Sequence, residues 1–270
     1  MKKTITTIFA TVVAVSAFAL TPDEAAVKAS IESMFKAGQE GKLVTSIFEA
    51  MPTSHQKGFY DVSQAFAKKM DPMVWNSGVS VMSNFGKVLS TKSDFIVNSA
   101  MAKQVPSPSA DACKKGDLKA ADVLAAGKFF SSIASITLAD IKSQPNAKAL
   151  AAYLDSKIGK LPACEMPTYT IKTEQDGDIV VYFAGRTDGV EFEKVKGKWL
   201  PEELADPDFD DILEDINEDM NFATEEGQQF KMQAMMFSAM ANGALAPVLQ
   251  AKTQEEFDAA VSAIFKSLGF

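Results

Sequence analysis

The chain has 270 residues, of which 47% are hydrophobic and 23% are charged, a composition typical of a globular protein rather than a disordered one. With 27 Lys and Arg against 35 Asp and Glu, its formal net charge is -8, which argues against sequence-independent binding of nucleic acid or anionic lipid. Arg186 is the only arginine, and one His and two Cys offer little for catalytic triads or transition-metal sites, so we expect no cofactor and no metal.

The first residues have the three-part pattern of a secretory signal peptide. Lys2 and Lys3 precede an uncharged, largely apolar stretch over residues 5–18, and Ala17-Phe18-Ala19 is an A-x-A cleavage site. The apolar stretch is short for a membrane span. We therefore expect a cleaved Sec-type signal peptide over residues 1–19, a mature chain without a membrane span, and a periplasmic or secreted location.

Residues 20–102 are predicted to form an all-helical block. Thr21-Pro22-Asp23-Glu24 has the pattern of a capping box with Pro at the first helical position. Hydrophobic residues then recur at helical spacing to about residue 100.

One helix of this block starts within Ser54-His55-Gln56-Lys57, which matches the S-x-x-K pattern of penicillin-recognising serine enzymes. The accompanying S-D-N and K-T-G elements are missing. We therefore expect Thr53 or Ser54 to cap the helix, and no nucleophile is assigned here.

A second helical block, residues 113–164, is bracketed by the two cysteines, Cys113 and Cys164. A loop rich in Pro and Ser, Val105 to Ser109, precedes it. Because two cysteines in an exported chain usually pair, we predict a structural disulfide between them; the alternative is two buried free thiols. Neither cysteine belongs to a C-x-x-C pattern, so a redox-catalytic role is not supported.

Residues 165–270 are predicted to hold a β-meander followed by helices. Alternating hydrophobic segments separated by Asp-Gly turns indicate three or four antiparallel strands over about residues 168–200. The segment Ile179–Phe183 is apolar on both faces and should be a central strand. The predicted fold class is α+β, mostly helical, with this one small sheet packed between helical blocks in a single domain over residues 20–270.

From Glu202 to Glu226 there are twelve carboxylates and no Lys or Arg. Asp206, Asp208 and Asp210 alternate as at the start of a calcium loop, but Asp211 and Asn217 stand where that loop needs Gly and Glu. We therefore expect a solvated acidic helix face, which either steers a basic partner or serves solubility alone.

The helix predicted over about residues 224–246 is rich in Met and Phe, and no charged residue occurs from Met232 to Ala251. Polar residues and Pro247 interrupt this stretch, which favours a buried helix over a membrane span. Met and Phe on a helix can also line an adaptable apolar pocket. The candidate ligand-binding residues of such a pocket are Phe230, Met232, Met235, Met236, Phe237 and Met240.

No G-x-S-x-G, H-E-x-x-H, phosphate-loop or dinucleotide-binding motif occurs in the chain. We therefore expect an exported, non-enzymatic protein that binds a basic partner protein or a hydrophobic small molecule or lipid. Two alternatives stay open. One is a carboxylate-based envelope hydrolase, which would place paired acids in a polar cleft, and the other is a structural component of the envelope.

Overall fold

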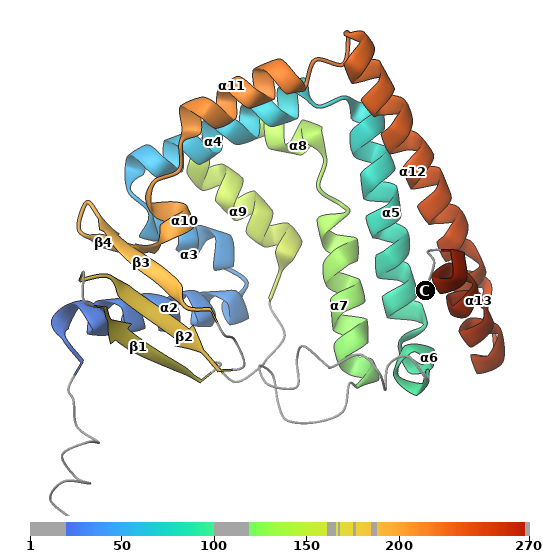
Figure 1. Cartoon of the computed structure of the whole chain (residues 1–270), viewed down its shortest axis with the longest axis horizontal. Coiled ribbons are helices and arrows are strands. Elements are labelled where there is room, and N and C mark those ends of the chain that lie inside the picture. Colours follow the sequence, from blue (N-terminus) through green and yellow to red (C-terminus); the bar gives the residue numbers. More distant parts are fainter. Residues whose placement is uncertain are drawn as a thin grey trace, which may run out of the picture.

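The computed structural model describes residues 20–99, 119–160, 166, 168–174, 177–184 and 188–267. Within these residues the chain forms helices and one four-stranded antiparallel sheet, which confirms the mostly helical α+β fold class. The sheet lies at one end of the molecule, and most of the helices extend away from it (Figure 1). The predicted signal peptide, Cys113 and Cys164 lie outside the described residues, and the cleavage and the disulfide stay predictions.

The first helical block is confirmed. At its start, Thr21 Oγ1 accepts a hydrogen bond from Glu24 N at 3.2 Å, and Glu24 Oε2 accepts one from Thr21 N at 2.7 Å, which is the predicted capping box. The block consists of α2 (Pro22–Glu40), α3 (Leu43–Ala50), α4 (Thr53–Lys69), α5 (Pro72–Thr91) and α6 (Ser93–Asn98).

The expected cap of α4 is wrong. Pro52 occupies the N-cap position and makes no side-chain capping hydrogen bond, while Thr53 is already the first helical residue. The Gln56 side chain instead donates to the Met51 carbonyl at 3.0 Å. The fixed φ of Pro52 suits a helix entry without a capping hydroxyl.

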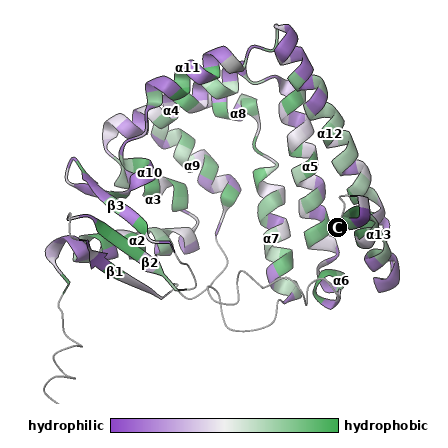
Figure 2. Ribbon diagram, in the orientation of Figure 1, coloured by the Kyte–Doolittle hydropathy of each residue, from purple (hydrophilic) through white to green (hydrophobic). Residues whose placement is uncertain are grey.

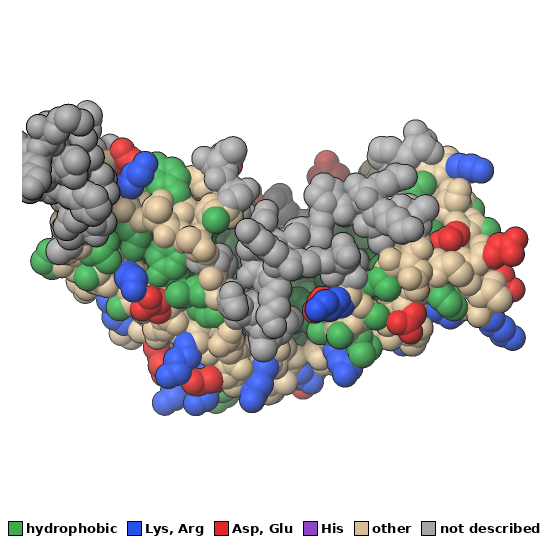
Figure 3. Space-filling model, turned by 90° about the horizontal axis from the view of Figure 1, so that it is seen from below, with side chains coloured by type: hydrophobic (Ala, Val, Ile, Leu, Met, Phe, Trp, Pro, Cys, Tyr) green, Lys and Arg blue, Asp and Glu red, His purple; other side chains and the backbone are tan. Residues whose placement is uncertain are grey.

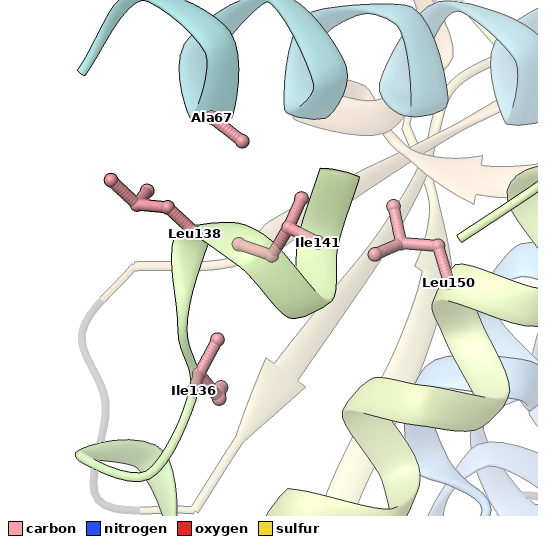
Figure 4. Close-up of a cluster of buried hydrophobic side chains, with 5 residues drawn as sticks. All are labelled: Ala67, Ile136, Leu138, Ile141 and Leu150. Atoms are coloured by element: carbon pink, nitrogen blue, oxygen red, sulfur yellow. The ribbon is translucent and has the colours of Figure 1, made fainter. Parts of the chain in front are cut away.

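The second block contains α7 (Ala120–Ile133), α8 (Leu138–Ser143) and α9 (Ala147–Ile158), of which the short α8 was not expected. Helices α4, α8 and α9 enclose one of the hydrophobic clusters of the core (Figure 4). Its buried members are Ala67, Ile136, Leu138, Ile141 and Leu150.

A carboxylate from α9 caps α3 across the fold. Lys42, at the N-cap position of α3, makes no side-chain capping bond. Asp155, only 7% exposed, accepts hydrogen bonds from Val44 N at 2.7 Å and Thr45 N at 3.0 Å instead. The free N–H groups of the first turn of α3 are thus satisfied by a distant residue, which fixes α3 against α9.

The sheet is a meander with the strand order β1-β2-β3-β4, as predicted. The inner strand β2 is the most uniformly hydrophobic one (Figure 2), and its residues Ile179, Val180 and Val181 are all buried. One face of the sheet packs against Val27 of α2. The strands are β1 (Tyr169–Thr173), β2 (Ile179–Phe183), β3 (Val190–Val195) and β4 (Lys198–Pro201).

The remaining chain is helical. Phe209 of α11 packs against α4, where a Cβ on Gly58 would lie 2.2 Å from the Phe209 ring, so α11 can approach only because position 58 is glycine. Helix α12 runs alongside α5, on the side away from α7 (Figure 1). The helices are α10 (Glu202–Ala205), α11 (Phe209–Asp219), α12 (Glu225–Gln250) and α13 (Gln254–Ser267).

Candidate functional site

Helix α12 turns its largest hydrophobic side chains away from the protein. The expectation of a buried helix is therefore wrong for these residues, and their role in binding an apolar ligand stays a prediction. Each of the six candidate ligand-binding residues is at least 38% exposed, and Phe237 is 70% exposed. These exposed residues, which we call the apolar face of α12, are Phe230, Met232, Met235, Met236, Phe237 and Met240.

Five of the six residues of the apolar face are neighbours at helical spacing; Phe230 is set apart, because Gln233 and Ala234 stand three and four residues after it. Met232, Met236 and Met240 follow one another at intervals of four residues, so they form one stripe, and Phe237 lies beside it three residues before Met240. From residue 230 to residue 240 the face extends about 15 Å along the axis. If each of the six side chains exposes on the order of 100 Å², the face amounts to roughly 600 Å², the upper end of the largest apolar patch on a typical monomer.

The opposite side of α12, which packs on α5, is held by polar groups over most of its length. Ser238 is buried there. Asn242 accepts a hydrogen bond from Asn84 Nδ2 at 2.8 Å through its Oδ1 and donates to Ser80 Oγ at 3.2 Å through its Nδ2. The last turns of α12 are also anchored by hydrophobic packing, in a cluster that includes Val88, Val248 and Phe257.

An ion pair fixes the beginning of α12. Lys231 Nζ lies 2.7 Å from Asp71 Oδ2, and the two side chains are only 19% and 17% exposed. Asp71 also caps α5, because its Oδ1 accepts from Met73 N at 2.7 Å and Val74 N at 3.2 Å. The hydrogen bond from Lys231 is the main reason why the pKa of Asp71 lies below its ordinary value.

The orientation of α12 could have been found in the sequence. Lys231, Ser238 and Asn242 are separated by seven and four residues, so a helix places all three on one face. We missed this signal because the number of Met and Phe residues in the segment favoured hydrophobic burial.

Charge is distributed unevenly along the chain. Residues 202–270 hold 15 acidic residues and 3 lysines, a formal charge of -12, whereas residues 1–201 hold 20 acidic and 24 basic residues, a formal charge of +4. The face seen from below in Figure 3 carries side chains of both signs among hydrophobic ones. The negative charge is therefore concentrated on the segment that contains α11, α12 and α13.

Several of these acids line a groove of about 430 Å³ between the start of α4 and the connection from α10 to α11. They are Asp206, Asp208 and Asp210, and Asp61 of α4 also lines this groove. Asp61 pairs with Lys57, and Asp208 caps α11 by accepting a hydrogen bond from Asp211 N at 3.1 Å. Among the described residues, no three His, Cys, Asp or Glu side chains are grouped so that they could hold a metal ion. Two of the four aspartates thus have structural roles.

Ser54 and Lys57, the two defining residues of the S-x-x-K pattern, are not paired with each other; Ser54 Oγ lies 3.2 Å from His55 Nδ1. Lys57 pairs with Asp61 one turn further along α4, and it is Lys196 Nζ that donates to Ser54 Oγ, at 2.9 Å. His55 Nε2 lies 2.9 Å from the Ala205 carbonyl, which can only accept, so this nitrogen carries the proton. These contacts fasten the exposed start of α4 to α10 and to the β3–β4 turn.

No protein-family model matches the chain, and neither the curated proteins nor the solved structures include one that is significantly similar. None of the described helices combines the length and the hydrophobicity needed to cross a bilayer.

Proposed function

We propose that this protein is an exported, non-enzymatic binding protein that holds a partner protein against the apolar face of α12. The proposal rests on the orientation of this helix, in which polar residues face the protein and large hydrophobic residues face water. Small and polar residues attach α12 to α5, while Met232, Met236 and Phe237 are left in contact with water. Contiguous exposed apolar surface of this size marks interaction sites in soluble proteins.

A protein partner fits this surface better than a small apolar ligand does. Small-molecule sites are concave and cover most of the ligand, whereas the apolar face lies on the outside of a helix. With about 600 Å² exposed, the face would supply most of the roughly 800 Å² that each side contributes to a standard protein–protein interface. Methionine suits this use, because its flexible and polarizable side chain adapts to the surface of a partner.

Export is supported by the sequence of residues 1–19, with Lys2 and Lys3, an apolar stretch and the A-x-A site. The processed protein would begin at Leu20. Mass spectrometry of the protein recovered from its own cells tests this part, since retention of residues 1–19 contradicts cleavage.

The binding proposal is tested by photo-crosslinking in the cells that make the protein. A photoreactive phenylalanine analogue replaces Met236, which is exposed on α12, or Lys148, which is exposed on α9 and serves as the control. We expect a discrete adduct of higher mass with the probe at position 236 and none with the probe at position 148.

Two further substitutions test whether the adduct depends on the apolar face of α12. With the probe at position 236, Met232→Gln and Met240→Gln should remove most of the adduct while the protein stays folded, because both side chains are exposed. Equal adducts at positions 236 and 148, or no adduct at position 236, would contradict the proposal.

A further inference from the structure

We infer that the partner segment held by the apolar face of α12 is a basic amphipathic helix. This inference rests on the proposed function and specifies the chemistry of the partner. An amphipathic helix lying on an apolar surface presents hydrophobic residues at helical spacing, and its polar residues contact the rim of the site. The charge of that rim therefore selects the partner.

Exposed carboxylates lie just before the apolar face and beyond the C-terminal end of α12. Glu225 and Glu226 are exposed in the first turn of α12, immediately before Phe230. Beyond its last turn, Glu255 and Glu256 are exposed in the first turn of α13.

Basic residues are few in this part of the sequence, although Lys92 donates a hydrogen bond to the Ala251 carbonyl at the end of α12. The only lysines in residues 202–270 are Lys231, Lys252 and Lys266, and Lys231 is already paired with Asp71. Lysines or arginines near both ends of a bound helix would therefore meet an excess of carboxylates.

The lengths agree with this arrangement. The uncharged stretch from Met232 to Ala251 covers 20 residues, the last 19 of α12 and its C-cap Ala251, or about 30 Å along the helix. A bound helix of similar length would lay its apolar side chains over Met232, Met236 and Met240 and reach the acidic residues at either end. Met-rich surfaces within acidic surroundings suit basic amphipathic helices because the thioethers adapt while the charges steer the approach.

The same charges disfavour two other occupants. A second copy of this chain docked with the two α12 helices parallel would bring its own Glu225 and Glu226 towards the same residues of the first copy, and like charges at an interface oppose association. An anionic membrane surface would repel a segment with a formal charge of -12 over residues 202–270.

The test measures the binding of three synthetic peptides of about 20 residues, ~30 Å when helical, to the purified full chain by fluorescence anisotropy. The first peptide has Leu on one face and Lys on the other. The second replaces every Lys with Glu, and the third replaces every Leu with Gln. We expect the Leu/Lys peptide to bind at least about tenfold more tightly than either of the others, and salt to weaken its binding.

Two variants locate the binding. Met232→Gln combined with Met236→Gln and Met240→Gln should weaken binding of the Leu/Lys peptide by at least about tenfold. Glu225→Gln with Glu226→Gln should weaken it by about threefold or more. The matched control, Glu49→Gln with Asp122→Asn, removes the same two charges from exposed positions on α3 and α7 and should leave binding unchanged.

The outcomes separate this inference from the proposed function. If the Glu and Lys peptides bind equally and both depend on the methionines, the basic preference is overturned and docking on α12 stands. If no peptide binds but the Met236 adduct with another protein forms, the inference is again overturned alone. A self-adduct at position 236 with a dimer in solution assigns the face to a second copy, and methionine-dependent binding to phosphatidylglycerol vesicles assigns it to a membrane. If neither peptide binding nor an adduct is observed, both proposals fail.

Discussion

Helix α5 contacts α7 along one side and α12 along another, and the two interfaces are built differently. On the α7 side the backbones approach each other closely. A Cβ on Gly127 would lie 2.5 Å from Ser90 N, and one on Gly86 would lie 2.9 Å from the Gly127 carbonyl oxygen. On the α12 side the helices are joined through side chains, by the ion pair of Lys231 with Asp71 and the hydrogen bond of Asn242 with Asn84.

This difference shows how one helix can be firmly attached and still leave hydrophobic residues for a partner. The interface of α5 with α7 depends on close packing of the two backbones, so an atom added at the contact must push the helices apart. The α12 interface combines directional polar contacts, which fix the rotation of the helix about its axis, with hydrophobic packing at the last turns of α12. With α12 held in this rotation, the methionines face outward and the binding surface exists before a partner arrives.

The largest expected effect is that of Gly127→Ala on the α7 side. The new methyl group overlaps the backbone of α5, and we expect a loss of about 2–3 kcal/mol in the free energy of unfolding even after the higher helix propensity of Ala is included. Urea denaturation measures the change. Gly78→Ala on α5, where no atom lies within 4 Å of the new Cβ, is the control and should stabilise the protein slightly. Equal stability of the two variants would refute close backbone packing.

The α12 side should respond less and with a dependence on pH. Asp71→Asn keeps a capping oxygen but removes the charge opposite Lys231, and we expect a loss of about 1 kcal/mol at pH 7. The pKa of Asp71 is depressed in the folded protein from an ordinary value of 3.8. Its stabilising contribution is therefore fully present above that value and is lost as the pH falls through the lower folded pKa.

Urea denaturation of the wild type and of Asp71→Asn at several pH values between about 7 and 2 tests this linkage. The difference between the two proteins should be constant near neutral pH and disappear at the acid end. A difference that stays constant throughout would show that the charge of Asp71 does not contribute.

Local sequence patterns were sufficient for much of this architecture and insufficient for its contacts. The capping box at Thr21 and the doubly apolar segment Ile179–Phe183 were predicted correctly, because neighbouring residues determine both. The Asp155 cap on α3 could not be predicted, since its hydrogen-bond partner Val44 is 111 residues away. The α8 and α10 helices are too short to show a hydrophobic period.

For the candidate site, the composition of α12 pointed to this helix, but the direction in which its hydrophobic residues face was predicted wrongly. The apolar residues were singled out as a group from the sequence, but burial was inferred from their hydrophobicity alone. The contacts of Lys231 and Asn242 with α5 set the opposite orientation. A binding surface breaks the usual rule that hydrophobic residues face inward, so reasoning from that rule fails at such a surface.

Two glycines of α12 distinguish its solvent-facing side from the side that packs against the protein. No atom lies within 4 Å of a Cβ on Gly243, whereas a Cβ on Gly227 would lie 2.1 Å from the Asn221 carbonyl oxygen. Gly243→Ala should therefore raise the free energy of unfolding by about 0.5–1 kcal/mol through helix propensity. Gly227→Ala, which gains the same propensity, should lower it. Thermal denaturation of both variants distinguishes the two environments, and a destabilised Gly243→Ala would mean that this side of α12 is covered.

The smallest expected effect on stability belongs to the residues with the largest expected effect on binding. Met236→Gln removes hydrophobic surface that stays in contact with water in the folded protein, so we expect the free energy of unfolding to change by less than about 0.5 kcal/mol. Val248→Ala, which deletes buried methyl groups in the last turns of the same helix, is the control and should cost about 1–2 kcal/mol. A loss above about 1 kcal/mol for Met236→Gln would show that the methionine is buried within the chain itself. Unchanged stability together with lost peptide binding would show that hydrophobic surface on α12 serves recognition and not folding.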